Sequence, residues 1–493
     1  MRPLPFVFFR SSSKRKRLHR WNGRYQGGVV GGINTSAVST VVEDFLAADA
    51  AAKKIGANFS LATSGWTLGP AEDRAYFDKV LPPGWTLTSI DETLGDSPVE
   101  SAYSNVTAHN SWIIPWAEDD PHLGTTQLWV NRTLQHMEQA QGYGVDGALA
   151  ITWRMEAVSP TLWALAQRGW NASLTASTAW TRWAAGEFGL AAPGDAEQVG
   201  AALAAFEGAE RLLSTSGCPG LVAGCAAPAS AAEFRGKVEA FLALAPLVGS
   251  DPAYVERWNT WSSLFRYVVS AADAGCAAVN YSTAAAAVRG MPSASDRRTA
   301  AEATLLPLMI RLVGGAQNTT TLLLEAATGP GELGMLATLH DAILLGTCSG
   351  CNADTSFHLN WLNASARAEL AGWLNASLPA EATPTTSYVG RPRIVMGAAR
   401  SSVDRGEALP LTARLLTPKK AHGSVEIRYK ALGSSQAWTV VQMAASDRGQ
   451  VYQGTVPPQA DDFEFFVHAP SLGLAWPPGS ERGDGRAQTV VVI

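Results

Sequence analysis

The sequence lacks long apolar runs and has no excess of positive charge. None of its 493 residues belongs to an apolar run of about 18 residues, so no transmembrane helix is expected. The 43 acidic residues outnumber the 38 basic ones, and a net charge of -5 provides no field that would attract phosphates. Nucleic acid is therefore not expected as a partner. A hydrophobic fraction of 46% and a charged fraction of 16% indicate a globular protein of several domains.

Common catalytic motifs are also absent. The glycine-rich stretch at 27–32, GGVVGG, lacks the Lys and Ser/Thr of a phosphate-binding loop and does not have G-x-G-x-x-G spacing. The sequence contains no G-x-S-x-G elbow, no H-E-x-x-H helix and no recognisable Cys/His pairing among its eight histidines. These absences argue against nucleotide-dependent, serine-hydrolase and zinc-protease chemistry, and no cofactor is expected.

Cysteine is scarce, with five residues in the chain. Cys218 and Cys225 bracket a Gly/Pro loop, and Cys348 and Cys351 form a second close pair. This spacing predicts two local disulfides, or bonds between the two pairs, with Cys276 left free. A four-cysteine zinc site is the alternative, although the spacing of the first pair is loose for it.

Asparagine is used in an unusual way. Of the fourteen Asn residues, nine stand in N-x-Ser/Thr, whereas chance would leave about two such sites. This excess predicts N-glycosylation, and with it a secreted or cell-wall location. The nine are Asn34, Asn58, Asn105, Asn131, Asn171, Asn280, Asn318, Asn363 and Asn375.

The first residues do not fit that location. MRPLPFVFF has too short an apolar stretch for a signal peptide and is followed closely by KRKR. We expect residues 1–30 to be a basic, disordered segment, and the chain to be an incomplete version of a longer secreted protein. The alternative is that the N-x-Ser/Thr sites are incidental and the basic segment is a nuclear-type or solvated tail.

Residues 31–175 alternate between apolar strands and helical patterns. Strands are expected near 58–66, 86–92, 112–120 and 145–154, with helices at 37–56, 71–81 and 125–144 between them. Such repeats form parallel sheets with right-handed crossovers. Because four strands cannot close a (β/α)8 barrel, we interpret this region as the C-terminal half of one. A small open α/β sheet is the alternative.

The remainder of the chain changes character twice. Residues 176–378 carry apolar residues at helical spacing throughout, and an all-α region is expected there, with its tryptophans in core packing. A linker at 379–390 follows. Residues 391–493 contain short alternating strands separated by Gly, Asp and Pro turns, which predict an antiparallel β-sandwich of immunoglobulin or fibronectin type.

Three acids follow the third expected strand. Glu118 and Asp119 are the candidate catalytic residues, because glycosidic cleavage needs one carboxyl group that donates a proton and another that activates water or attacks the sugar. Asp120 is expected in the substrate pocket, and Asp91–Glu92 could provide the second carboxyl group. A metal site formed by Asp119, Asp120 and His122, or plain surface charge, is the alternative; no metal is expected.

Aromatic and basic side chains end the neighbouring strands. Trp66, Trp116 and Trp153 are expected to stack on sugar rings, and the two-residue period of the last strand puts Arg154 at the mouth of the site. The carboxyl ends of parallel strands share one edge, so these side chains are expected to converge. For Arg154, an ion pair with a nearby carboxylate is the alternative to contact with substrate.

The segments LATSGWTLGP, IPWAEDDP and YGVDGALAITWR, with the helical region and terminal sandwich, resemble the later part of secreted glycoside-hydrolase-type barrel proteins. This superfamily includes α-glucuronidases, hexosaminidases and related algal and bacterial proteins. The resemblance covers residues 40–180 and implies a carbohydrate substrate and glycosidic cleavage. A non-catalytic glycan-binding or cell-wall protein on a degenerate barrel is the alternative. Hexosaminidases have an Asp-Glu pair where this chain has Glu118-Asp119-Asp120, so a substrate-assisted mechanism is not implied.

Overall fold

The structure is a computed structural model that divides the chain into two compact units. Unit 1 comprises residues 1–119, 129–152 and 160–179, and unit 2 comprises 120–128, 153–159 and 180–493. The structure describes residues 7–8, 35–56, 61–63, 65, 67–70, 72–90, 95–119, 125–152, 154–213, 222–327, 364–384, 388–397, 399–418, 423–446, 450–482 and 487–493.

A parallel sheet forms the centre of unit 1. Its strands run in the order β1-β2-β3-β4-β5, and every neighbouring pair is parallel. The four strands expected from the sequence are confirmed, although they are shorter, and β1 adds a strand from the segment predicted to be disordered. The strands are β1 (Val7–Phe8), β2 (Leu61–Ala62), β3 (Thr86–Ile90), β4 (Asn110–Ile114) and β5 (Gly147–Ala148).

Helices connect these strands, as the alternating pattern predicts. They are α2 (Thr35–Lys54), α3 (Tyr76–Val80), α4 (Val130–Gly142) and α5 (Ser159–Trp170), with a 3-10 turn at Ser101–Asn105. The expected helix at 71–81 is wrong in length, because turns precede α3: Asp73 N–H donates to the Pro70 carbonyl, and Tyr76 N–H donates to the Asp73 carbonyl. Phe45, Phe77, Leu87 and Ile113 pack into one core, which buries the apolar faces of these helices against the sheet.

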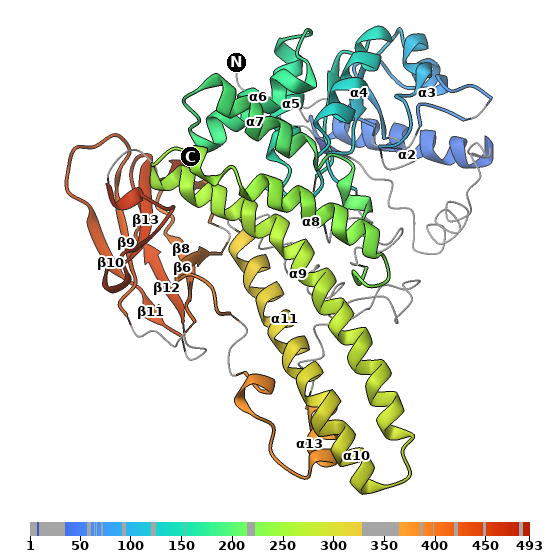
Figure 1. The fold of residues 1–493 in the computed structure, drawn as a ribbon. Coiled ribbons are helices and arrows are strands. Elements are labelled where there is room, and N and C mark those ends of the chain that lie inside the picture. The colour runs from blue at the N-terminus through green and yellow to red at the C-terminus, as the bar shows by residue number, and fades with distance from the viewer. Residues whose placement is uncertain are drawn as a thin grey trace. The chain divides into compact units, whose positions relative to one another are not determined.

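Between residues 180 and 374, the described part of unit 2 is mainly helical. Its helices are α6 (Ala176–Phe188), which begins in unit 1, α7 (Pro193–Ala204), α8 (Pro228–Leu242), α9 (Pro252–Arg289), α10 (Ala294–Ala300), α11 (Leu306–Ala326) and α13 (Ala364–Leu374). A π-helical turn at Ala301–Leu305 joins α10 to α11. The long helices α9 and α11 lie side by side (Figure 1) and share an apolar core with α13. The all-α prediction is confirmed for these residues.

Helix α9 has a glycine in its interior. The helix runs through Gly275 and continues to Arg289. Gly275 does not end the helix; instead it admits the backbone of Ala223, because a Cβ at Gly275 would lie 3.1 Å from the Ala223 Cα. An isolated glycine costs a helix about 1 kcal/mol, which the apolar contacts on both sides of it outweigh.

Aromatic rings fill the centre of the helical region. Phe206 stacks on Phe265 with ring centroids 4.0 Å apart, and Phe241 stacks on Trp258 at 4.2 Å. Trp258 and Trp261 are buried, so their expected role in core packing is confirmed. Such rings bury large apolar areas and add favourable edge and stacking contacts.

The C-terminal residues form two sheets. One has the order β10-β9-β13-β15-β7 with β14 beside β13, and the other has the order β11-β12-β8-β6. One apolar core takes residues from both sheets, including Leu411 and Phe465. The antiparallel prediction holds for every pair except β15 and β7, which are parallel. The strands are β6 (Arg393–Met396), β7 (Ser402–Val403), β8 (Leu409–Leu416), β9 (Glu426–Ala431), β10 (Thr439–Gln442), β11 (Ala444–Ala445), β12 (Val451–Val456), β13 (Phe463–Ala469), β14 (Leu474–Trp476) and β15 (Gln488–Val492).

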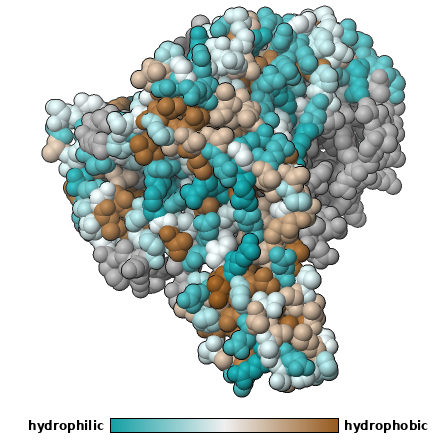
Figure 2. All heavy atoms as spheres, in the orientation of Figure 1, coloured by the Kyte–Doolittle hydropathy of each residue, from teal (hydrophilic) through white to brown (hydrophobic). Residues whose placement is uncertain are grey.

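The surface shows no continuous apolar area on the face drawn in Figure 2, where hydrophobic residues form small patches among hydrophilic ones. Within the described part of the chain, no helix combines the length and the apolarity needed to cross a bilayer.

Candidate functional site

The chain that leaves β4 carries the predicted acids into the interior of unit 1. Trp116 forms a parallel bridge with Ile151, and Ala117 N–H donates to the Ile151 carbonyl at 3.0 Å. Glu118 and Asp119 follow directly, and both are 0% exposed. This excludes plain surface charge for these two residues, because burying a carboxylate is costly unless it is paired or hydrogen-bonded.

Asp119 is held by a helix that follows it in the chain. Arg132 of α4 donates to both carboxylate oxygens of Asp119, at 2.9 and 3.1 Å, and to the Trp116 carbonyl at 2.7 Å. The Arg132 guanidinium lies over the Trp129 ring, 3.7 Å from its centroid. Gly95 permits this packing, because a Cβ there would lie 2.5 Å from Arg132 Cζ. The two-pronged ion pair fixes Asp119 in position and neutralises its charge.

A cavity of about 600 Å³ opens at the carboxyl ends of β3 and β4. Ser89 and Ile90 end β3 at one side, and the residues at 113–115 end β4 at another. The loop at 97–105 encloses the cavity further, together with Arg74 and His136. Parallel α/β sheets place their ligand sites at this edge.

Polar groups inside this cavity are connected to one another. Glu100 accepts a hydrogen bond from the Ser89 hydroxyl at 3.2 Å and lies 3.9 Å from Arg74 Nε. Arg74 donates in turn to the Thr67 hydroxyl at 3.0 Å. His136 comes from α4 and is 7% exposed. The cavity therefore offers a carboxylate, a guanidinium and an imidazole to a ligand.

Tyr103 has a structural role in the cavity wall. Its hydroxyl accepts from Ser89 N–H and donates to the Trp112 carbonyl, each at 2.7 Å. Burial raises the pKa of Tyr103 well above its usual value, so the phenol stays neutral. These bonds tie the 97–105 loop to the ends of β3 and β4.

The sequence missed the polar residues of this cavity. Arg74 lies in the turn before α3, Glu100 in the loop after β3, and His136 within a predicted helix. No motif joins them, and only the position of the loop directly after a parallel strand could have drawn attention to Glu100. Arg132 also had no local signal, because its partner lies thirteen residues earlier.

The predicted site residues divide among several places. Trp116, Glu118 and Asp119 lie in unit 1 but not among the described residues that line the cavity. Arg154 belongs to unit 2, where it is buried and donates to the Thr125 carbonyl at 3.0 Å. The other predicted positions, Trp66, Asp91, Glu92, Asp120, His122 and Trp153, lie outside the described residues. Convergence of the seven predicted catalytic and pocket side chains thus stays a prediction.

Among the described residues, no group of three or more His, Cys, Asp or Glu side chains could hold a metal ion.

Comparison of this chain with protein-family models and with curated proteins finds no match.

Proposed function

We propose that this chain is a glycoside-hydrolase-like protein that binds carbohydrate at the carboxyl edge of the parallel sheet in unit 1. The observation that carries this proposal is the cavity of about 600 Å³ at the ends of β3 and β4. Its size suits a small ligand. Arg74, Glu100 and His136 supply donors and acceptors for sugar hydroxyl groups.

The strand order supports a relationship to barrel enzymes. Five parallel strands follow one another in chain order with helices between them, which is also the arrangement within a (β/α)8 barrel. We interpret the sheet as part of such a barrel, and the terminal sheets as a sandwich of immunoglobulin or fibronectin type. The resemblance of residues 40–180 to glycoside-hydrolase-type proteins is the second support.

A secreted or cell-wall location is part of the proposal. Six of the nine N-x-Ser/Thr asparagines lie among the described residues, and three of them, Asn131, Asn280 and Asn375, are exposed at positions away from the cavity of unit 1. Exposed side chains are the ones that can carry glycans. The free surface at these positions supports modification in the secretory pathway.

Binding without cleavage is the form that the geometry favours. The hydrolytic form needs Glu118 as proton donor and Asp119 as nucleophile or base, with the predicted pocket residues around them. The ion pair with Arg132 occupies both Asp119 oxygens, which opposes that role. Hydrolysis remains the second candidate because Glu118 is fully buried, and shielding from solvent is what glycosidases give a proton donor.

Titration of the full chain with a panel of cell-wall oligosaccharides tests the proposal. Calorimetry is expected to detect binding that Glu100→Gln weakens by about tenfold or more, since a charge-assisted hydrogen bond is lost. Glu138→Gln is the matched control, because Glu138 is an exposed acid on the same helix as His136. Absence of binding to every saccharide would overturn the proposal.

The same panel separates the two forms. Binding that survives Glu118→Gln and Asp119→Asn, with no product released by the unmutated protein, would support a binding protein. Product release that Glu118→Gln abolishes would establish the hydrolase.

A further inference from the structure

A second cavity, of about 410 Å³, lies in unit 2 along helices α8, α9 and α11. It exists because facing positions carry small side chains: Ala274 and Ala277 on α9, and Gly315 on α11. A Cβ at Gly315 would lie 3.0 Å from the Ala274 Cβ, so the two helices already touch there. Larger side chains at these positions would fill the space. We call this cavity the helical groove.

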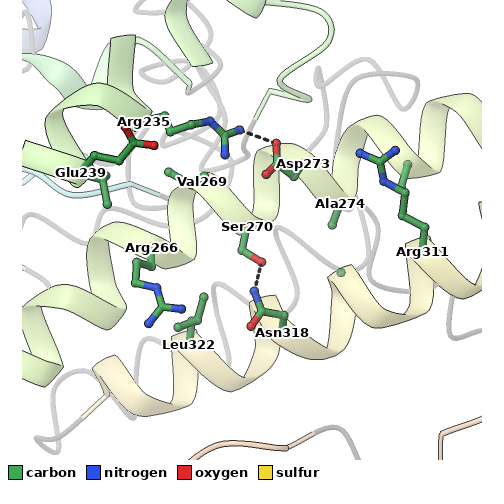
Figure 3. A pocket seen from close by; sticks show the side chains of 13 residues that line it. Arg235, Glu239, Arg266, Val269, Ser270, Asp273, Ala274, Arg311, Asn318 and Leu322 are labelled. Atoms are coloured by element: carbon green, nitrogen blue, oxygen red, sulfur yellow. Dashed lines mark hydrogen bonds and ion pairs between the residues drawn. The ribbon is translucent and has the colours of Figure 1, made fainter. Parts of the chain in front are cut away.

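Three arginines line the helical groove. Arg235 of α8 makes an ion pair with Asp273 at 2.9 Å, and both groups are exposed. Arg266 of α9 and Arg311 of α11 are exposed, and neither has an ion pair or hydrogen bond with another described residue. Figure 3 shows these two arginines on either side of the Ser270–Asn318 pair. Two unpaired guanidinium groups in one groove can bind an anion.

The other groups in the groove restrict the anion. Asn318 Nδ2 donates to the Ser270 hydroxyl at 2.8 Å, and Glu239 and Asp273 add two carboxylates to the lining. The three guanidinium groups exceed these two carboxylates by one positive charge. A sulfate ion has no hydroxyl group that could donate a hydrogen bond to these carboxylates. A ligand that carries hydroxyl groups beside its acidic group would instead donate to them.

The groove has no aromatic side chain among the residues that line it. Nucleotides and flavins, which are usually held by stacking on such rings, therefore have no platform here. Sugar rings need none when polar groups surround them. We propose that the helical groove binds an acidic saccharide with more than one carboxylate, such that Arg266 holds one carboxylate and Arg311 another, independently of the carbohydrate site of unit 1.

Calorimetric titration of the full chain with trigalacturonic acid, cellotriose and inorganic sulfate tests this proposal. Trigalacturonic acid is expected to bind at least about tenfold more tightly than either of the others. The affinity is expected to fall as salt rises, because the contacts are exposed. Equal affinity for cellotriose would overturn the proposal, and so would tighter binding of sulfate.

The variant Arg266→Gln/Arg311→Gln is expected to lose about tenfold or more in affinity for trigalacturonic acid. The matched control is Arg298→Gln/Arg414→Gln, which removes two exposed arginines elsewhere in unit 2 and changes the net charge equally. Equal losses in both variants would overturn the proposal. Glycosylation at Asn318, detected by mass spectrometry of the secreted protein, would also overturn it, because a glycan there would fill the groove.

A different observation concerns two cysteines of unit 2. Cys225 precedes α8 and Cys276 lies in α9, and both are free thiols in the structure. This corrects the expected Cys218–Cys225 bond for Cys225, whereas Cys218 lies outside the described residues. Cys225 N–H donates to Cys276 Sγ, and Gly224 N–H donates to the Ala272 carbonyl of α9 at 2.9 Å. The backbone thus holds one cysteine against the other.

We infer that Cys225 and Cys276 form a disulfide when a small disulfide such as glutathione disulfide is present. The exposed Cys225 attacks it as thiolate, and one glutathione leaves. The Cys276 thiolate then attacks Cys225 Sγ and the second glutathione leaves; the two protons of the protein thiols end on the two glutathiones. Burial raises the pKa of Cys276 to about 12, so this second step accelerates as pH rises.

Peptide mass spectrometry after incubation of the reduced full chain with glutathione disulfide tests the bond. A cross-link between Cys225 and Cys276 is expected, and Cys276→Ser is expected to leave Cys225 bound to glutathione. A Cys218–Cys225 cross-link would overturn the inference, as would recovery of Cys276 as a free thiol after prolonged oxidation at pH 9.

Discussion

The core of unit 1 and the helical groove of unit 2 handle charge in opposite ways. In the core of unit 1 charged groups lie inside: Glu118 and Asp119 are fully buried, and Arg132 is 11% exposed and paired. The helical groove is lined by small residues such as Ala274 and Gly315, and its Arg266 and Arg311 are exposed and have no hydrogen bond or ion pair with another described residue. Buried ion pairs fix geometry, whereas exposed unpaired charges remain available to ligands. The comparison teaches that buried, paired charges maintain the structure of a site, whereas exposed, unpaired charges can bind a ligand.

Among the substitutions that test this comparison, Arg132→Leu is expected to reduce the free energy of unfolding most. It leaves Asp119 buried without its ion-pair partner, and losing one partner of a buried pair costs about 3–5 kcal/mol. Urea denaturation at pH 7 measures the free energy of unfolding. The double variant Arg132→Leu/Asp119→Leu is the control and is expected to recover much of the loss. A loss below about 1 kcal/mol in the single variant would show that the pair is not structural.

The pH dependence of stability tests the same comparison at a second carboxylate of unit 1. Burial alone would raise the pKa of Asp78, but hydrogen bonds from Thr107, His109 and Ala108 outweigh it and hold the pKa below its usual value. The ionised form is therefore stabilised by folding. This stabilisation is complete above the pKa of the unfolded chain and is lost as pH falls through the lower folded pKa.

The substitution Asp78→Asn is accordingly expected to reduce the free energy of unfolding by about 1–3 kcal/mol at pH 7. The difference from the unmutated protein should shrink as pH falls below 4, and urea denaturation at several pH values measures it. Asp461→Asn, at a solvent-exposed position just before β13, serves as the control. A difference that grows at low pH would contradict the assigned direction.

The smallest effect is expected in the helical groove. The variant Arg266→Gln/Arg311→Gln removes no hydrogen bond or ion pair with the described residues, so its free energy of unfolding should stay within about 0.5 kcal/mol of the unmutated value. Thermal denaturation in the absence of saccharide measures this. A larger loss would place these arginines with Arg132 as structural groups and remove the contrast between the units.

Local patterns predicted the elements better than the site. Helix α4 falls within the expected helix at 125–144 and β3 within the expected strand at 86–92, whereas β4 begins two residues before the expected strand at 112–120. These features depend on neighbours along the chain. The cavity of unit 1 depends instead on Arg74 and Glu100, which come from separate connections. The sequence shows that Asp119 follows a strand, but it does not show that Arg132 will form an ion pair with both Asp119 carboxylate oxygens.

Hydrogen–deuterium exchange with and without the tightest-binding oligosaccharide tests most directly whether carbohydrate binds at the carboxyl edge of the sheet. Ligand contact slows exchange of backbone amides that it shields or stabilises. We expect slower exchange in the 97–105 loop and at 113–115, where the cavity of unit 1 lies. Slower exchange confined to unit 2, with those two segments unchanged, would contradict the proposed site.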